Sequence, residues 1–303
     1  MKELFSYLRN YFRQVNPLAL LLVSLLVAVL ISLNYTVGIE NNIMKTHSWA
    51  WRAMGFFLLY TSTFCAAWLL QCIFSSQTVI DKKAFFILLI ISPAIFAAKV
   101  SFNWFAQLIT SGMNYPWSQY WYITLAWPLK CVLVLSLVFI VWRKFRYDPP
   151  VSGLLLKGFN MKPYFLLLLC ISPLIVLAAT RPDFLHTYPK LQRISFIDGY
   201  SSHSFLWRLF FELSYGSDFF TIELFFRGFL VLAFIRYAGK DAILPMAAFY
   251  CTIHFGKPLF ECITSFFGGL ALGAIVYNTR SIWGGLIVHL GIAWLMELAG
   301  YIV

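Results

Sequence analysis

The chain has 303 residues, of which 61% are hydrophobic and only 12% are charged, and its mean hydropathy is +0.77. Soluble domains contain roughly 45–50% apolar and about 25% charged residues, and a soluble fold of this length still needs a polar exterior. The composition therefore excludes a soluble globular protein and predicts an integral membrane protein. The formal net charge of +11 does not indicate a nucleic-acid partner, because the basic residues lie mainly in short loops between apolar runs.

The apolar runs, taken in chain order, predict eight or nine transmembrane helices. A membrane-spanning helix needs about 20 mostly apolar residues, with a range of about 17–25. On that criterion the chain is expected to be an all-α bundle that crosses the bilayer many times. The nine predicted spans are residues 17–38, 49–74, 84–99, 120–142, 163–180, 217–236, 241–256, 262–278 and 282–300. The third and seventh are short, so each is either a tilted span or a partly re-entrant segment.

Segments beside these runs complete the predicted organisation. Residues 1–16 are too long and too aromatic for the n-region of a signal peptide, so the first span is expected to be retained. Residues 204–214 have the pattern of an amphipathic helix lying at the membrane interface before the sixth span. The cysteines form no CxxC motif or ligand-like spacing and are expected to be small buried hydrophobes. They are Cys65, Cys72, Cys131, Cys170, Cys251 and Cys262.

The distribution of Lys and Arg predicts the orientation of the chain. With the N-terminus inside, the predicted cytoplasmic segments hold thirteen Lys and Arg residues and the outer segments hold seven. This bias favours a cytoplasmic N-terminus. The loop 143–162, which contains Asp148-Pro149-Pro150, is the expected seam between two parts. Residues 1–150 would form variable transmembrane helices, and residues 151–303 would form the core that carries the motif residues.

Ionisable residues in the apolar segments of the back half mark the candidate functional site. A charge at bilayer depth costs about 2.5–3.5 kcal/mol, so such residues are functional candidates. Glu223 and Arg227 are four residues apart and share a helix face, where they either merely neutralise each other or belong to a site. The complete set is Asp218, Glu223, Arg227, His254, Glu261, His289 and Glu297.

The predicted depths of these residues bring some of them to one level. Counted from the inner ends of their spans, Glu223 and His254 each lie about thirteen residues in, or roughly 20 Å at a rise of about 1.5 Å per residue. A carboxylate and an imidazole that face each other in a dry cavity can activate water. His289 and Glu297 share a face of the last span, and either one could be level with Glu223. Glu261, at the outer turn, is more typical of a solvated charge at a helix N-terminus.

The order of these motifs resembles that of the CAAX-protease and bacteriocin-processing family of intramembrane endopeptidases, also called the ABI family. The resemblance covers about residues 205–300. The family pattern is EExxxR, then FxxxH, then HxxxN or HxxxD. By this resemblance Glu223 and Arg227 match the second glutamate and the arginine. His254 matches the histidine of the second motif, and His289 matches that of the third.

In the second motif, Tyr250 takes the place of the phenylalanine. Two other positions depart from the family pattern. Ile222 stands where the first glutamate belongs, and Ala293 stands where the asparagine or aspartate belongs. The resemblance implies that the first glutamate helps to activate water, so either Asp218 or Glu223 replaces it or the site is inactive. Loss of one oxyanion donor typically costs about 10²–10³ in rate. The further carboxylates expected near this cavity are Glu261 and Glu297.

These observations predict a membrane-embedded endopeptidase that cleaves a peptide or membrane-protein substrate near the bilayer surface. Glu223 or Asp218, together with His254, would activate the water. His289 would hold the oxyanion, and Arg227 would orient the carboxylate. Zinc is possible, because Glu and His ligate it, although nothing in the spacing requires a metal. The alternatives are a non-catalytic relative that binds a membrane or lipidated peptide and, less favoured, a proton-coupled transporter. The breadth of the resembled family suggests the bacterial inner membrane.

Overall fold

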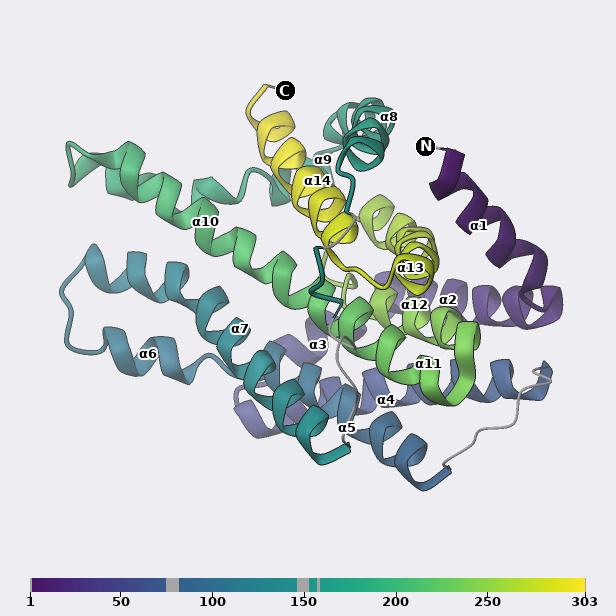
Figure 1. Ribbon diagram of the computed structural model, residues 1–303. Coiled ribbons are helices and arrows are strands. Elements are labelled where there is room, and N and C mark those ends of the chain that lie inside the picture. Colours follow the sequence, from purple (N-terminus) through teal and green to yellow (C-terminus); the bar gives the residue numbers. More distant parts are fainter. Residues whose placement is uncertain (1, 75–81, 146–152, 157–158, 303) are drawn as a thin grey trace.

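The computed structural model describes residues 2–74, 82–145, 153–156 and 159–302, and in this part of the chain every regular element is helical (Figure 1). Seven helices there are long and apolar enough to cross a membrane, which confirms a multi-pass all-α protein. Two of the nine predicted spans, however, have a different form. The seven candidate spans are Pro17–Val37, Trp49–Phe74, Lys83–Thr110, Trp117–Phe145, Lys162–Ala179, Leu259–Thr279 and Trp283–Ile302.

The front half begins with α1 and α2, and α2 shows why a span begins and ends where it does. Pro17 occupies the first helical position, and the Asn16 side chain accepts hydrogen bonds from the backbone N–H groups of Leu18 and Ala19. Both features favour a helix N-terminus. The helix ends at Gly38, whose φ of 74° is left-handed. The front-half helices are α1 (Lys2–Gln14), α2 (Pro17–Val37), α3 (Ile39–Met44), α4 (Trp49–Phe74), α5 (Lys82–Ser101), α6 (Trp104–Thr110) and α7 (Trp117–Phe145).

The back half contains a longer helix than the sequence predicted. Residues 204–214 are not a separate interfacial helix, because α10, η2 and α11 follow one another without a break. Residues 204–238 contain no proline, so the backbone hydrogen bonds continue, with a π-helical stretch at η2. The elements are α8 (Lys162–Ala179), α9 (Pro182–Thr187), η1 (Lys190–Gly199), α10 (Ser204–Glu223), η2 (Leu224–Val231), α11 (Leu232–Ala238), η3 (Gly239–Ala242), α12 (Ile243–Thr252), α13 (Leu259–Thr279) and α14 (Trp283–Ile302).

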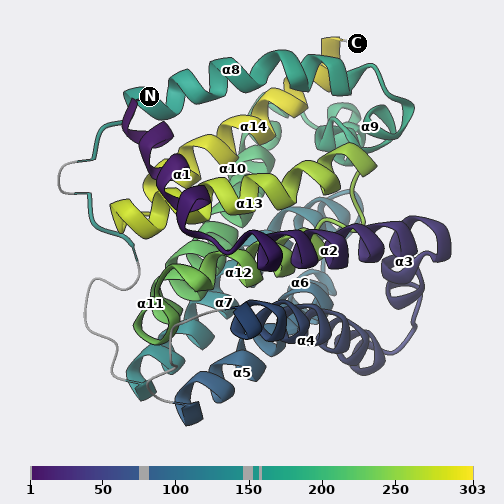
Figure 2. The same ribbon diagram turned by 90° about the vertical axis from the view of Figure 1, so that its right-hand side faces the viewer.

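The predicted seventh span, 241–256, is a short core helix followed by a turn. Every residue of α12 is buried, and the helix packs against α13, α4 and α2 at the centre of the molecule (Figure 2). A helix that is apolar on all sides can be either a membrane span or a core helix. Periodicity alone does not separate the two, and this short segment forms a buried helix and a turn instead of a full span.

The two halves share one apolar core. Front-half helices α2 and α4 pack on α12, and a continuous cluster of buried side chains includes Tyr60, Phe96 and Phe225. The expected seam at Asp148-Pro149-Pro150 lies outside the described residues. The motif-carrying helices are therefore supported by the N-terminal helices.

The six free cysteines are not all buried. Cys131, Cys251 and Cys262 are buried as expected, whereas Cys72 and Cys170 are exposed on α4 and α8. The expectation was wrong for these two, because the outward face of a membrane helix is as apolar as its core-facing side.

Candidate active site

Glu223 and Arg227 form a fully buried ion pair where α10 continues into η2. Glu223 Oε1 lies 3.0 Å from Arg227 Nη1, and both side chains are 0% exposed. The Arg227 guanidinium also lies over the ring of Tyr250 on α12, 4.1 Å from its centroid. Each buried charge has an opposite charge beside it, which a buried ion needs. The pair expected from the four-residue spacing is present, on a π-helical turn of the kind often found at functional sites.

His289 of α14 extends this pair into a chain of polar contacts. Its Nδ1 lies 3.0 Å from Glu223 Oε1, and its Nε2 lies 3.2 Å from the Tyr250 hydroxyl oxygen. A carboxylate only accepts hydrogen bonds, so Nδ1 carries a proton and donates it. In the neutral ring Nε2 then accepts from the Tyr250 O–H. Of the two candidates on this helix, His289 and not Glu297 is therefore the neighbour of Glu223.

Gly285 provides the space in which this contact forms. It lies four residues before His289 on the face of α14 that meets Glu223. A Cβ atom at this position would be 2.3 Å from Glu223 Oε2. That oxygen is buried and accepts no hydrogen bond from the described residues. The close approach of α14 to the carboxylate therefore requires glycine.

His254 lies on the turn between α12 and α13 and is not in contact with Glu223. Its Nδ1 is 3.0 Å from the Tyr250 carbonyl oxygen and donates to it, so the neutral ring keeps a lone pair on Nε2. Its ring also packs edge-on against Tyr250, with centroids 4.7 Å apart. The predicted direct facing of Glu223 and His254 is thus not observed, and Tyr250 is the residue that contacts Arg227, His254 and His289 alike.

A cavity of about 600 Å³ lies beside these side chains. Glu223 does not line it and lies behind the residues that do. The two departures from the family pattern, Ile222 and Ala293, face the cavity. At both positions its wall is therefore apolar, where the family pattern has polar side chains. The site residues on the wall are Arg227, Tyr250, His254 and His289.

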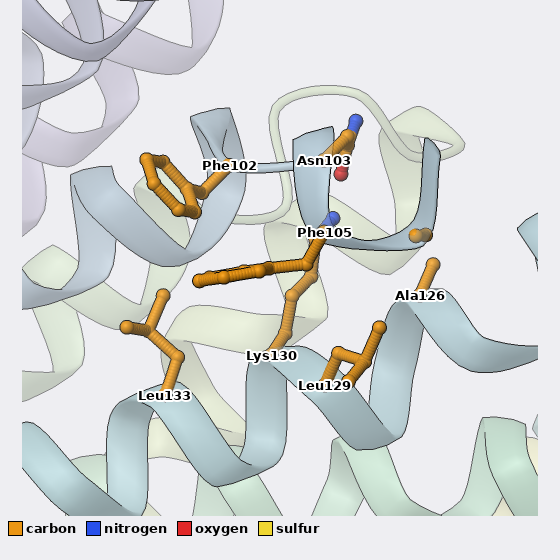
Figure 3. Close-up of a pocket in the computed structure, with 8 residues that line it drawn as sticks. Phe102, Asn103, Phe105, Ala126, Leu129, Lys130 and Leu133 are labelled. Atoms are coloured by element: carbon orange, nitrogen blue, oxygen red, sulfur yellow. The ribbon is translucent and has the colours of Figure 1, made fainter. Parts of the chain in front are cut away.

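The wall formed by α5, α7 and α10 is charged. Asp218 lies 2.6 Å from the Lys99 ammonium, which belongs to the front half of the chain. Lys130 of α7 lines both the large cavity and a much smaller adjoining hollow, in which it extends past Leu129 toward Phe105 (Figure 3). Asp218 is thus already paired with a lysine on a neighbouring helix.

The two remaining carboxylates predicted from the sequence also have partners. Glu261 lies 3.5 Å from the Lys257 ammonium and accepts a hydrogen bond from the Tyr188 hydroxyl at 3.1 Å. Glu261 lines the cavity. Glu297 instead accepts the backbone N–H groups of Lys190 and Leu191 at 2.8 and 3.3 Å, so it holds the start of η1.

The donor set does not fit the zinc ion that the sequence allowed. Among the residues that the structure describes, no three His, Cys, Asp or Glu side chains converge as metal ligands do. Glu223 and His289 are in contact, but the Nδ1 atom of His254 is directed to a backbone carbonyl.

Two residues of the site had no assigned role in the sequence. Lys99 is one of the seven Lys and Arg residues of the predicted outer segments, and Tyr250 enters the sequence pattern only in the place of a phenylalanine. A hydroxyl added at a phenylalanine position among buried ionisable residues was the available signal for Tyr250. No local pattern indicates that Lys99 meets Asp218, because the two lie on different helices.

The segment that carries these side chains is similar to a known family. Residues 204–295 match the family model of the type II CAAX prenyl endopeptidase Rce1-like proteins. No match was found among curated proteins or solved structures. The matched segment contains Glu223, Arg227, His254 and His289. Residues 204–295 are therefore similar to the Rce1-like type II CAAX prenyl endopeptidases, in agreement with the resemblance that the order of the sequence motifs predicts.

Proposed function

We propose that the protein is an intramembrane endopeptidase that hydrolyses a peptide bond with water activated beside His254. The observation that carries this proposal is the meeting of an imidazole, a phenol and a guanidinium on the wall of one cavity. These groups belong to His254, Tyr250 and Arg227, with His289 beside them. Acyl transfer needs a held nucleophile, a proton acceptor and donors for the oxyanion, and this wall offers side chains for each.

The roles follow from the hydrogen-bond partners of the two histidines. The Nε2 lone pair of His254 can accept a hydrogen bond from the attacking water. The Tyr250 hydroxyl can donate to the oxyanion that forms on the substrate carbonyl when its hydrogen turns from His289 Nε2 to that oxygen. The fully buried Arg227 guanidinium, which lies over the Tyr250 ring, supplies positive charge behind this donor. Glu223 holds Arg227 and His289 in place through the 3.0 Å contacts. In this assignment Glu223 is a positioning residue, because it does not reach the cavity.

The shape of the cavity supports a substrate with an apolar or lipid-modified segment. Leu174 of α8 and Phe260 of α13 both line the cavity and are 55% and 53% exposed. The cavity therefore reaches the molecular surface between these helices through apolar side chains, which lipid tails would cover. A peptide with a prenyl group, the class that the family description names, could enter there from the bilayer.

A second function is favoured by Ile222 and Ala293. Both face the cavity where the family pattern has a glutamate and an asparagine or aspartate. A non-catalytic relative would bind a membrane protein or lipidated peptide in this cavity and leave it intact. The two proposals differ in whether new N-termini are formed.

We would test catalysis by comparing membrane-proteome N-termini in cells that produce the wild-type chain and the His254→Ala variant at equal levels. A peptidase should generate N-termini that are absent with His254→Ala and present with His47→Ala, an exposed histidine outside the cavity. Identical N-termini in all three samples, together with different captured partners, would instead support the binding function.

A further inference from the structure

Glu40, from the front half of the chain, lines the same cavity as His254. It lies on α3, the short helix after the first span, and is distant in sequence from the family segment 204–295. The sequence patterns do not single it out. Its place beside the site is set by how α2 and α3 dock on the turn that carries His254.

Three hydrogen bonds fix this docking. The buried Asn34 side chain donates from Nδ2 to the Phe255 carbonyl oxygen at 3.0 Å, and its Oδ1 accepts the backbone N–H of Glu40 at 3.0 Å. The Tyr35 hydroxyl donates to the Lys257 carbonyl oxygen at 2.6 Å. The start of α3 and the turn 253–258 therefore form one unit.

The Glu40 carboxylate lies directly against Gly256. A Cβ atom on Gly256 would be 2.9 Å from Glu40 Oε1 and 3.2 Å from Oε2. Gly256 follows His254 by two residues, so their Cα atoms are separated by at most about 7.6 Å. The carboxylate is thus beside the His254 turn and open to the same cavity.

Among the described residues, Glu40 differs from the other carboxylates on the cavity wall in having no partner. Asp218 is paired with Lys99, and Glu261 with Lys257. The Asp183 oxygens accept hydrogen bonds from the backbone N–H groups of Phe184 and Leu259.

Within the described part of the chain, by contrast, no hydrogen bond or ion pair reaches the Glu40 carboxylate. Burial raises the pKa of Glu40 above its usual value, which brings the carboxyl closer to the range in which a general base works. The carboxylates that line the cavity are Glu40, Asp183, Asp218 and Glu261.

We propose that Glu40 is the general base of the peptidase reaction and supplies the carboxylate that Ile222 cannot. This inference rests on the proposed endopeptidase function. As the water oxygen bonds to the substrate carbonyl carbon, Glu40 takes one of its protons and His254 Nε2 accepts a hydrogen bond from the other. When the tetrahedral intermediate collapses, the C–N bond breaks and the Glu40 carboxyl gives its proton to the leaving nitrogen. The water is consumed, and Glu40 returns to its ionised form.

The test uses isolated membranes that contain the full chain, incubated from pH 5 to pH 8, with the rate of formation of His254-dependent N-termini as the readout. Removal of a general base costs about 10²–10⁴ in rate, so the rate of the Glu40→Gln variant should be lower than the wild-type rate by that factor. The wild-type rate should rise with pH as the carboxyl loses its proton, and this rise should be missing in Glu40→Gln. Glu3→Gln, which removes an exposed carboxylate outside the cavity, should match the wild type.

Chemical rescue and thermal unfolding separate a base from a structural residue. Formate should restore part of the cleavage rate of Glu40→Ala, because it can occupy the vacated carboxylate position. It should not restore the cleavage rate of His254→Ala. Because the pKa of Glu40 is higher in the folded state than in the unfolded state, its ionisation destabilises the fold. This destabilisation is fully present at a pH above the folded-state pKa and is absent at a pH below the unfolded-state pKa. Glu40→Gln should therefore unfold at a higher temperature than the wild type at pH 7, with the difference vanishing at pH 4.

Failure of the Glu40 assignment and failure of the endopeptidase proposal give different results. A Glu40→Gln rate and pH profile equal to the wild type would overturn the assignment of Glu40 while leaving the endopeptidase intact. A lower Glu40→Gln rate that still rises with pH, together with a Glu40→Ala rate that formate does not restore, would also overturn it. That combination would indicate a structural role for Glu40. If the wild type forms no His254-dependent N-termini, the endopeptidase proposal itself is wrong.

Discussion

At the scale of the residue, the absence of a single Cβ determines where the buried carboxylate of Glu223 lies. Because a methyl group at Gly285 would be 2.3 Å from Glu223 Oε2, Gly285→Ala must displace either the carboxylate or α14. Overpacking of this kind typically destabilises by about 1–3 kcal/mol. We expect Gly285→Ala to unfold at a lower temperature in detergent and to lose His254-dependent cleavage.

Gly268→Ala is the matched stability control for that substitution. It also lies inside a membrane helix, but a Cβ there meets no atom within 4 Å. Since alanine is favoured over glycine in a helix interior by about 1 kcal/mol, this variant should be as stable as the wild type or more stable. Equal unfolding temperatures for the two alanine variants would contradict the steric role of Gly285.

The Tyr250 hydroxyl is a second feature of residue scale, because it contacts His289 Nε2 and faces the cavity. Tyr250→Phe restores the family residue and removes only this oxygen. With Ala293 unable to donate, the hydroxyl becomes the neutral donor to the oxyanion once its hydrogen turns away from His289 Nε2. Its loss should therefore lower the cleavage rate by about 10²–10³. The unfolding temperature should change little, since one neutral hydrogen bond contributes about 1 kcal/mol. An unchanged rate would remove Tyr250 from the oxyanion role.

At the scale of the element, the α2–α3 junction acts on the site through the turn 253–258. Asn34→Ala would leave the Phe255 carbonyl and the Glu40 N–H without their partners. Unmet buried polar groups cost about 1–3 kcal/mol each, so the turn should open more often. Hydrogen exchange of the amides in 253–258 should become faster in this variant.

The control for the docking experiment lies on the same junction. The Asn42 side chain donates to the Val37 carbonyl at 3.1 Å, but this bond is exposed and stays within α2 and α3. Water can replace it, so Asn42→Ala should leave exchange in 253–258 unchanged. Equal acceleration in both variants would mean that the junction loosens as a whole and that Asn34 has no specific role.

At the scale of the whole molecule, the chain is a helical bundle in which a short buried helix carries the site turn. The sequence predicted the multi-pass all-α class and the resemblance of the back half to the CAAX-protease family, and both are confirmed. It overcounted the spans, because α12 is as apolar as a span without being one. It divided the helix at 204–238, because polar residues near Ser214 and Asp218 interrupt the apolar run without interrupting the backbone hydrogen bonds. The catalytic roles of the site residues and the inside location of the N-terminus stay predictions.

Local sequence patterns were sufficient to predict that this fold lies in a lipid bilayer and to predict part of its site. Long apolar runs require lipid, and the four-residue spacing of Glu223 and Arg227 brings them onto one helix face whatever surrounds them. Only the tertiary structure decided which side chains meet across the bundle. The bond between Asn34 and Phe255 joins residues 221 positions apart, and the contacts of Glu40 with Gly256 and of Lys99 with Asp218 likewise join distant segments. Such pairs depend on how helices pack, and packing is set by all the side chains at once.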